Sequence, residues 1–303
     1  MCATCGCSSG GVVRLLVAEH LHDLGRDHRH SDYGYSGHGH GSHGLADHAG
    51  PDHVHPDHVH PDHGQPDHVH PAAGELHSLQ APDGPRTIEL QQKVLAKNDE
   101  LAAQNRAWLA RHGILAVNLM SSPGAGKTTL LEATMHGMAG RASISVVEGD
   151  QETALDASRI LATGSKVVQV NTGVGCHLDA DMLARALRVL DPPSGSIVMI
   201  ENVGNLVCPA LFDLGEQARV VLASVTEGAD KPLKYPHMFR QADLVLLNKT
   251  DLLPYVDFDI RDYASGLRKV TPDALFLQVS ATTGDGMQTW FDWLRRRTPV
   301  PRE

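Results

Sequence analysis

The sequence has no apolar run long enough to span a bilayer, few aromatic residues and an odd number of cysteines. Its apolar stretch near the N-terminus, GGVVRLLVAEHL, is interrupted by Arg14 and Glu19, so we expect neither a signal peptide nor a membrane anchor. Five cysteines in 303 residues match no disulfide framework, which favours a reducing, cytoplasmic location. A formal net charge of −10 argues against binding to nucleic acid or to an anionic membrane surface.

The first 85 residues differ in composition from the rest of the chain. Of the 20 histidines, 16 lie between His20 and His77. A five-residue repeat, PDHVH with one PDHGQ, runs from Pro51 to His70, and a proline at every fifth position blocks helix propagation. Because this segment has little apolar surface to bury, residues 1–85 are predicted to be a flexible arm, and residues 86–303 a folded domain.

The histidine repeat has the side chains of a metal buffer. Imidazoles two residues apart, with carboxylates nearby, suit several Ni²⁺ or Zn²⁺ ions held with moderate affinity. An inert solvated linker is the alternative interpretation. The storage ligands predicted on the repeat are His53, His55, His58, His60, His68 and His70.

The rest of the chain alternates between helical and strand patterns. From Thr87 to His112, apolar pairs recur every seven residues, which predicts a helix that packs on its own domain or, alternatively, dimerises. A second helix is predicted near Gly286 to Arg297. The short, almost wholly apolar runs between them predict an α/β fold with a mostly parallel sheet covered on both faces. These candidate strands are residues 114–120, 143–148, 166–170, 196–201, 219–225, 244–248 and 274–279.

The segment SSPGAGKTT lies between the first of these strands and a predicted helix. It fits the phosphate-loop pattern except at its first position, where Ser121 replaces glycine. Backbone amides at the helix N-terminus would face the phosphates, Lys127 would reach the outer phosphates, and the Thr128 hydroxyl would ligate Mg²⁺. A glycine-rich turn without a ligand is the alternative. The predicted phosphate-binding residues are Gly124, Ala125, Gly126, Lys127, Thr128 and Thr129.

The segment NKTD, which begins at Asn248 and includes Lys249, indicates guanine as the base. The Asp251 carboxylate can accept hydrogen bonds from the guanine N1–H and 2-amino groups, and adenine has neither donor on that edge. Ser280 and Ala281, after the next strand, resemble the loop that completes guanine recognition in GTPases. GTP and GDP are therefore the predicted ligands.

Two acidic residues at strand ends are candidates for catalysis. Glu201, in IVMIENVGN, resembles the acid of a D-x-x-G switch and is predicted to hold Mg²⁺ directly or through water. Asp150 is a candidate for the other switch or, alternatively, a helix N-cap. No glutamine follows Gly204 and no arginine stands out as a built-in finger, so slow intrinsic hydrolysis is expected.

Cys176 and His177 lie side by side after the third strand, and Cys208 lies inside the predicted switch. Thiolate and imidazole suit Ni²⁺ or Zn²⁺. Two adjacent ligands do not complete a coordination shell, and a two-fold axis would supply a second pair, which hints at a symmetric dimer. The alternative is a packed cysteine beside a histidine at a helix entry.

These motifs together resemble the HypB family, the P-loop GTPases of the SIMIBI class that insert nickel into hydrogenases. The resemblance rests on CATCGC, the histidine-rich stretch, SSPGAGKTT, NTGVGCHLDADM, ENVGNLVCP and NKTD. It implies a three-layer GTPase domain, GTP-dependent dimerisation, and nickel delivery to a [NiFe] hydrogenase large-subunit precursor with an accessory partner. It also implies an internal metal site at Cys176, His177 and Cys208, and an N-terminal nickel site at Cys2, Cys5 and Cys7.

The N-terminal cysteines suit that implied role. Three thiolates and the free amine of the chain could offer the square-planar set that Ni²⁺ favours, whereas a zinc knuckle needs four protein ligands. Nucleotide state is expected to change metal affinity at the internal site, and metal to change nucleotide affinity or turnover. Rival interpretations are a urease-accessory nickel GTPase, a metal-storage protein with a regulatory nucleotide domain, and a zinc-handling GTPase.

Overall fold

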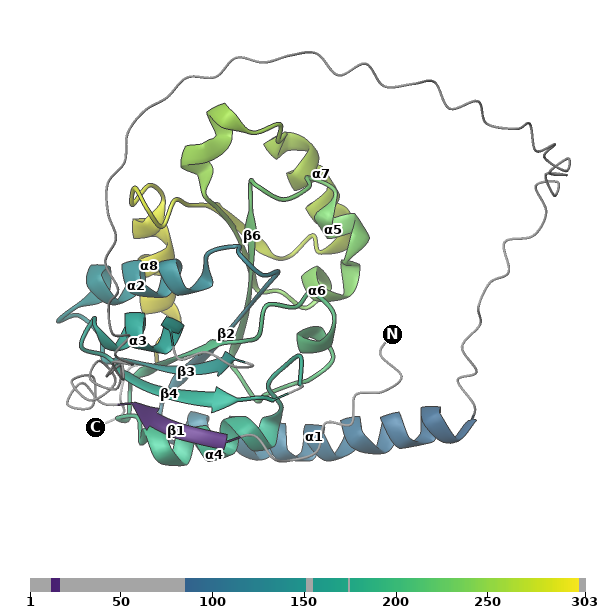
Figure 1. Ribbon diagram of the computed structural model, residues 1–303, viewed down its shortest axis with the longest axis vertical. Helices are drawn as coiled ribbons and strands as arrows, with labels where there is room; N and C mark the ends of the chain where they lie inside the picture. The colour runs from purple at the N-terminus through teal and green to yellow at the C-terminus, as the bar shows by residue number, and fades with distance from the viewer. Residues whose placement is uncertain (1–11, 17–84, 151–154, 174, 300–303) are drawn as a thin grey trace, which may run out of the picture. The chain divides into compact units, whose positions relative to one another are not determined.

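The computed structural model describes residues 12–16, 85–150, 155–173 and 175–299. These residues form an eight-stranded sheet with helices on both faces (Figure 1). The strands are β1 Val12–Leu16, β2 Leu115–Ser121, β3 Ile144–Asp150, β4 Lys166–Asn171, β5 Ile197–Glu201, β6 Ala218–Ser224, β7 Leu244–Asn248 and β8 Leu275–Gln278. The helices are α1 Pro85–Arg111, α2 Lys127–Met138, α3 Leu155–Leu161, α4 Ala180–Leu190, α5 Lys231–Lys234, α6 Pro236–Arg240, α7 Ile260–Val270 and α8 Met287–Arg297. Two 3-10 turns, η2 Cys208–Ala210 and η3 Thr250–Tyr255, complete the elements.

The strand order is β1-β4-β3-β5-β2-β6-β7-β8, and every neighbouring pair except β1 with β4 is parallel. This confirms the predicted α/β class. All seven predicted strands are present with bounds shifted by two residues at most, because an apolar run flanked by polar residues identifies a strand that is covered on both faces.

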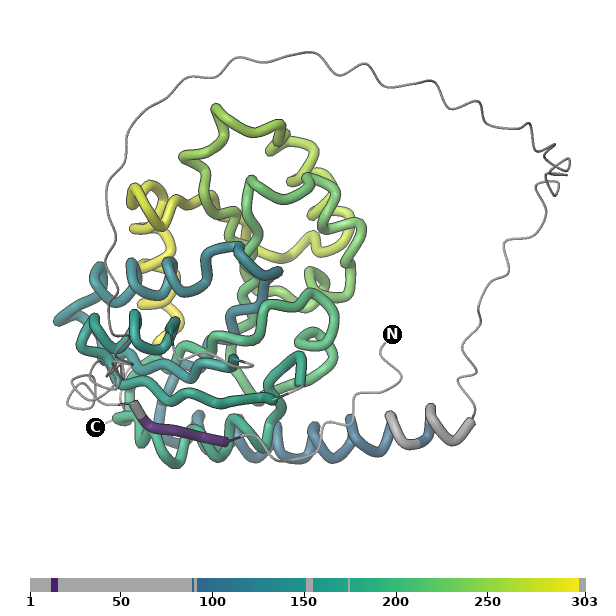
Figure 2. Tube along the Cα trace, in the orientation of Figure 1, coloured from purple at the N-terminus to yellow at the C-terminus, as the bar shows by residue number. Residues whose placement is uncertain are grey.

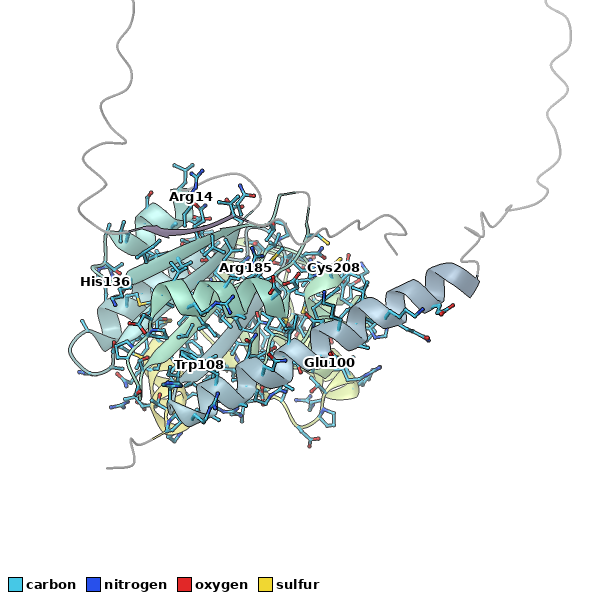
Figure 3. The ribbon with its side chains drawn as sticks, turned by 90° about the horizontal axis from the view of Figure 1, so that it is seen from below. Arg14, Glu100, Trp108, His136, Arg185 and Cys208 are labelled. Carbon is cyan, nitrogen blue, oxygen red and sulfur yellow. The ribbon has the colours of Figure 1, made fainter. Side chains whose placement is uncertain are left out.

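Three groups of buried side chains hold the layers together. On one face, α2, α3 and α8 cover the sheet, and the largest buried side chain there is Trp290. On the other face, α1 and α4 cover β2 to β5, while α6 and α7 cover β6 and β7 around Tyr263. Figure 3 views the domain from the α1 side and labels Trp108 on α1 and Arg185 on the neighbouring α4. The result is a three-layer α/β/α domain, as predicted.

The long helix α1 packs on its own domain through its second half. Ala102 and Leu109 are fully buried, whereas Val94 near the beginning of the helix is exposed. Asn98 and Asn105 are also buried, and both bond to Ala180 at the beginning of α4. The predicted apolar seam is therefore a packing surface in its second half, and two asparagines strengthen it by satisfying backbone groups.

Strand β1 departs from the prediction that residues 1–85 form a flexible arm. It pairs antiparallel with β4, with Val12 opposite Asn171 and Val13 opposite Val170, and Val13 packs against the α1 and α4 core. A five-residue edge strand has too short an apolar pattern to be separated from a linker. The division of the chain at residue 85 otherwise stays a prediction, because residues 17–84 lie outside the described part.

No helix in the described part of the chain has the length and apolar character that a membrane crossing requires.

Candidate functional site

The loop between β2 and α2 has the backbone of a phosphate-binding loop. The Cα trace in Figure 2 shows the chain turning from β2 into α2. Gly124 and Gly126 have φ values of 75° and 98°, in the left-handed region where a side chain is strained. A Cβ on Gly126 would also lie 2.7 Å from Nδ2 of Asn248. Glycine is therefore required at position 126 by both conformation and space.

Ser121 explains why the loop tolerates a residue other than glycine at its first position. It is the last residue of β2, is fully buried, and has no left-handed backbone. Its hydroxyl donates to the Ser122 carbonyl at 2.6 Å and accepts a hydrogen bond from Nζ of Lys127 at 2.9 Å. The serine thus holds the lysine close to the loop.

Thr128 and Glu201 meet beneath the loop. The Thr128 hydroxyl donates to Oε1 of Glu201 at 2.9 Å, and Oε2 of Glu201 is buried with no hydrogen-bond partner among the described residues. Burial raises the pKa of Glu201 to about 7, although Lys127 and the Thr128 hydroxyl act in the opposite direction. A buried hydroxyl beside a spare carboxylate oxygen is a fitting donor set for Mg²⁺, a hard cation that binds oxygen. Burial lowers the pKa of Lys127.

A second buried carboxylate, Glu148, lies next to Glu201 across the β3–β5 pairing. Burial, with the nearby charge of Glu201 as the next largest cause, raises the pKa of Glu148 to about 9. Its carboxylate accepts a hydrogen bond from the Ala157 amide in α3. Sequence analysis missed this residue, although a single charge inside the apolar run SISVVE was a signal.

Asp150 ends β3 in the same acidic region. Its charge favours the protonated form of Lys127, and its backbone carbonyl accepts a hydrogen bond from the Thr172 amide at 2.9 Å. Residues 151–154, which separate Asp150 from the described part of α3, lie outside the described residues. Both interpretations of Asp150, a switch acid beside the phosphates and a helix N-cap, therefore stay predictions.

The segment that begins at Asn248 packs directly on the phosphate loop. Asn248 donates from Nδ2 to the Ala125 carbonyl at 3.0 Å and accepts from the Ala281 amide at 3.1 Å. Lys249 has a left-handed backbone with φ 61° and donates from Nζ to the Gly124 carbonyl at 2.7 Å. One asparagine side chain thus joins the phosphate loop to the loop after β8.

Asp251 is positioned by Ser280, whose hydroxyl donates to Oδ1 of Asp251 at 2.6 Å. Ser280 is fully buried and also accepts from the Thr283 amide at 3.1 Å, so it is well fixed. The carboxylate keeps a second oxygen and further acceptor capacity for the two donors of guanine. The structure thus brings together all the predicted nucleotide-binding residues from three separate segments.

An arginine that sequence analysis did not identify also lies beside the loop. Arg159 of α3 donates to Oγ1 of Thr129 at 3.3 Å and to Oε2 of Glu132 at 2.6 Å. It also pairs with Asp156 at 3.4 Å. Nothing in its local sequence signals this position, because the contact depends on how α3 packs against α2.

Three potential metal ligands, two from the loop after β4 and one from the segment after β5, lie close together. The ligand atoms of Cys176, His177 and Cys208 all lie within 4.8 Å of one another, and Sγ of Cys176 is 3.7 Å from Nδ1 of His177. His177 is buried with its ring 3.9 Å from that of Phe212, between centroids. Burial lowers the pKa of His177, although Asp179 acts in the opposite direction, so the neutral imidazole that binds metal is favoured.

This Cys–His–Cys group is the one cluster of its kind in the part of the chain that the structure describes. Thiolate and neutral imidazole ligands suit Ni²⁺ and Zn²⁺. The predicted N-terminal nickel ligands and the histidines of the repeat lie outside the described residues. They are Cys2, Cys5, Cys7, His53, His55, His58, His60, His68 and His70.

Comparison with known proteins identifies close relatives. The model of the CobW/HypB/UreG nucleotide-binding domain matches residues 115–278. The chain is 51% identical over 237 residues to the hydrogenase maturation factor HypB of Azotobacter vinelandii, covering 75% of this chain and 78% of that protein. It is 54% identical over 209 residues to HypB of Escherichia coli strain K12, covering 69% and 72%. The crystal structure of HypB from Helicobacter pylori in complex with nickel has a TM-score of 0.63 and 35% identity, covering 68% of this chain and 99% of that one.

Proposed function

The chain belongs to the HypB family of hydrogenase maturation factors, and on that premise we propose that it hydrolyses GTP to deliver nickel to a [NiFe] hydrogenase precursor. The proposal rests on the observation that one short segment contributes to both the nucleotide site and the metal site. It ends β5 with Glu201, which bonds to the phosphate loop, and it contributes Cys208 to the metal cluster. A single stretch of backbone therefore belongs to both sites.

The nucleotide half of the mechanism follows from the contacts of the loop. Asp251 accepts from the guanine base, the amides at the beginning of α2 bind the phosphates, and Lys127 balances the charge that builds up on them. Thr128 and Glu201 would hold Mg²⁺, which supplies further charge stabilisation on the phosphate oxygens when it is bound. Asp150 is the residue proposed to act at the γ-phosphate side. Slow turnover is part of the proposal, because no glutamine follows Gly204.

In the metal half, Cys176, His177 and Cys208 bind the nickel ion that is the cargo. Three ligands leave a coordination position open for a partner to take the ion. A GTP-dependent homodimer could supply further ligands across a two-fold axis. Zn²⁺ is a competing ion, because the same ligands suit it.

The N-terminal cysteines and the histidine repeat extend the proposal. Cys2, Cys5 and Cys7 are proposed to capture Ni²⁺, and the repeat to store it. The proposed recipients are a maturation accessory protein and the hydrogenase large-subunit precursor.

A cellular experiment tests the function directly. In a strain that lacks this gene but contains a [NiFe] hydrogenase, Lys127→Ala and Cys176→Ala should each abolish hydrogenase activity at low nickel supply. Lys93→Ala, which removes an exposed lysine of α1, is the matched control and should restore full activity. Excess nickel in the medium should rescue Cys176→Ala. Full activity of Lys127→Ala at low nickel would refute a requirement for GTP hydrolysis.

A purified-protein experiment isolates the internal site. With Cys2, Cys5 and Cys7 replaced by Ala, the remaining cysteines of the chain are Cys176 and Cys208. Charge-transfer absorption from thiolate to Ni²⁺ then reports that site alone, since the histidine repeat has no sulfur. The band should grow and saturate as nickel is added, with ions on the histidine repeat contributing nothing to it, and Cys208→Ala should weaken it. A titration without any such band would remove the metal half of the proposal.

A further inference from the structure

The segment that follows β5 alternates between the two sites along its length. Glu201 accepts the Thr128 hydroxyl at 2.9 Å, and Gly204 packs against Pro123 of the phosphate loop so closely that a Cβ would lie 3.0 Å from its Cα. Any movement of the phosphate loop is therefore passed to residues 201 and 204 by direct contact.

The residues next to these two face the metal-binding loop. Asn202 accepts the Leu178 amide on Oδ1 at 3.1 Å, one residue beyond His177. Asn205 donates from Nδ2 to the carbonyl of Cys176 at 3.4 Å. Two asparagine side chains thus connect the segment to the backbone on either side of the Cys–His pair.

Asn202 is firmly anchored. Its side chain is buried, its amide donates to the Leu119 carbonyl at 3.1 Å, and its Nδ2 donates to Oδ1 of Asn118 at 3.3 Å. Asn118 in turn donates to Glu216 at 3.3 Å. A buried side chain with this many bonds moves with the strand that holds it, and does not reorient independently.

We propose that Asn202 and Asn205 are positioning residues that couple the nucleotide state to the metal site, an inference that rests on the proposed function. A shift of the segment on GTP binding pulls on Leu178 through Asn202 and on Cys176 through Asn205. The same shift moves Cys208, so the spacing of the three ligand atoms changes with the nucleotide. Coupling of this kind is reciprocal: nickel changes nucleotide affinity by the same factor as nucleotide changes nickel affinity.

The test compares nickel affinity in two nucleotide states in the full chain with Cys2, Cys5 and Cys7 replaced by Ala. Nickel dissociation constants are measured by the thiolate charge-transfer band, with either GDP or a non-hydrolysable GTP analogue bound. The ratio of the two constants should be about fivefold or more in this background. Asn202→Ala and Asn205→Ala should each reduce the ratio to about twofold or less.

A matched control separates coupling from simple loosening of the loop. Asn98 is also buried; it accepts the Ala180 amide at 2.9 Å and donates to the Asp213 carbonyl at 2.8 Å, so it supports the same loop through hydrogen bonds outside residues 201–205. Asn98→Ala should weaken nickel binding equally in both states and keep the ratio. If the Ala variants fail to fold, Asn205→Asp removes only the donor to Cys176, because its remaining oxygens still accept the Val207 amide.

The outcomes distinguish the two proposals. If Asn202→Ala and Asn205→Ala keep the same ratio of nickel dissociation constants as the background protein, this inference is overturned and the proposed function stays intact. A ratio of one in the background protein would overturn the coupling itself and this inference, whereas GTP hydrolysis and nickel delivery are tested separately by the cellular experiment. Loss of the ratio in Asn98→Ala as well would show that loop stability, and not the two asparagines, determines it.

Discussion

The buried carboxylate of Glu148 makes the stability of this domain depend on pH in a defined direction. Its pKa is raised from 4.5 to about 9 in the folded protein. Between these values the native state holds one more proton than the unfolded chain. The stability is therefore fully present below pH 4.5 and is lost progressively as the pH rises towards 9.

The substitution Glu148→Gln removes this dependence and keeps an oxygen that accepts the Ala157 amide. Between pH 5 and pH 8 a fully retained proton changes the free energy of unfolding by about 4 kcal/mol, at ~1.36 kcal/mol per pH unit. Water entry and relaxation around the charged carboxylate reduce this to about 2 kcal/mol. The free energy of unfolding of the wild type should therefore fall by about 2 kcal/mol more than that of Glu148→Gln when the pH is raised from 5 to 8.

Urea unfolding at pH 5, 6, 7 and 8, without nucleotide or Mg²⁺, measures the difference. Groups that titrate equally in both proteins cancel in the comparison. Glu100→Gln is the control, because Glu100 lies on the exposed side of α1. Parallel pH curves for wild type and Glu148→Gln would refute the reasoning that burial holds this carboxyl neutral.

Three further predictions concern other residues. Asp251→Asn should lower GTP affinity roughly 100-fold and leave ATP affinity unchanged, measured by displacement of a fluorescent nucleotide, since the acceptor for two guanine donors is lost. Gly126→Ala should lower GDP affinity by about tenfold or more in the same assay, because φ is 98° and the new Cβ meets the Asn248 amide; normal affinity would contradict the tight fit. Thr134→Val should cost about 1–3 kcal/mol in urea unfolding, because it leaves Nε1 of Trp290, now bonded at 2.9 Å, without an acceptor. An unchanged unfolding midpoint would show that water replaces the threonine.

The main elements could be predicted from the sequence because their patterns are local. An apolar run such as LVLLN, residues 244–248, is bounded by polar residues and becomes β7 with the same bounds. Strand β1 could not be predicted in this way, because it is stabilised by pairing with β4, far along the chain. The short helices α5 and α6 likewise have too few residues for a periodic pattern.

The residues of the candidate site likewise fall into those that a local pattern predicts and those that it does not. The phosphate loop and the NKTD segment are readable because each function requires adjacent residues in a fixed pattern. The contact of Asn248 with Ala125, and that of Arg159 with Thr129, depend on packing between distant elements. Glu148 lies beside Glu201 only because β3 pairs with β5. No local pattern encodes these neighbours.

The antiparallel pairing of β1 also limits the reach of the N-terminal thiols. Val12 is opposite Asn171, at the end of the strand that leads to Cys176. Five residue steps separate Cys7 from Val12, and an extended chain covers at most ~3.6 Å per step, or about 18 Å. If Cys7 binds Ni²⁺ as proposed, such a short tether gives that ion an effective concentration in the millimolar range near the strand. Transfer from the proposed N-terminal site to the proposed internal site is then expected to proceed within one molecule, at a rate independent of protein concentration.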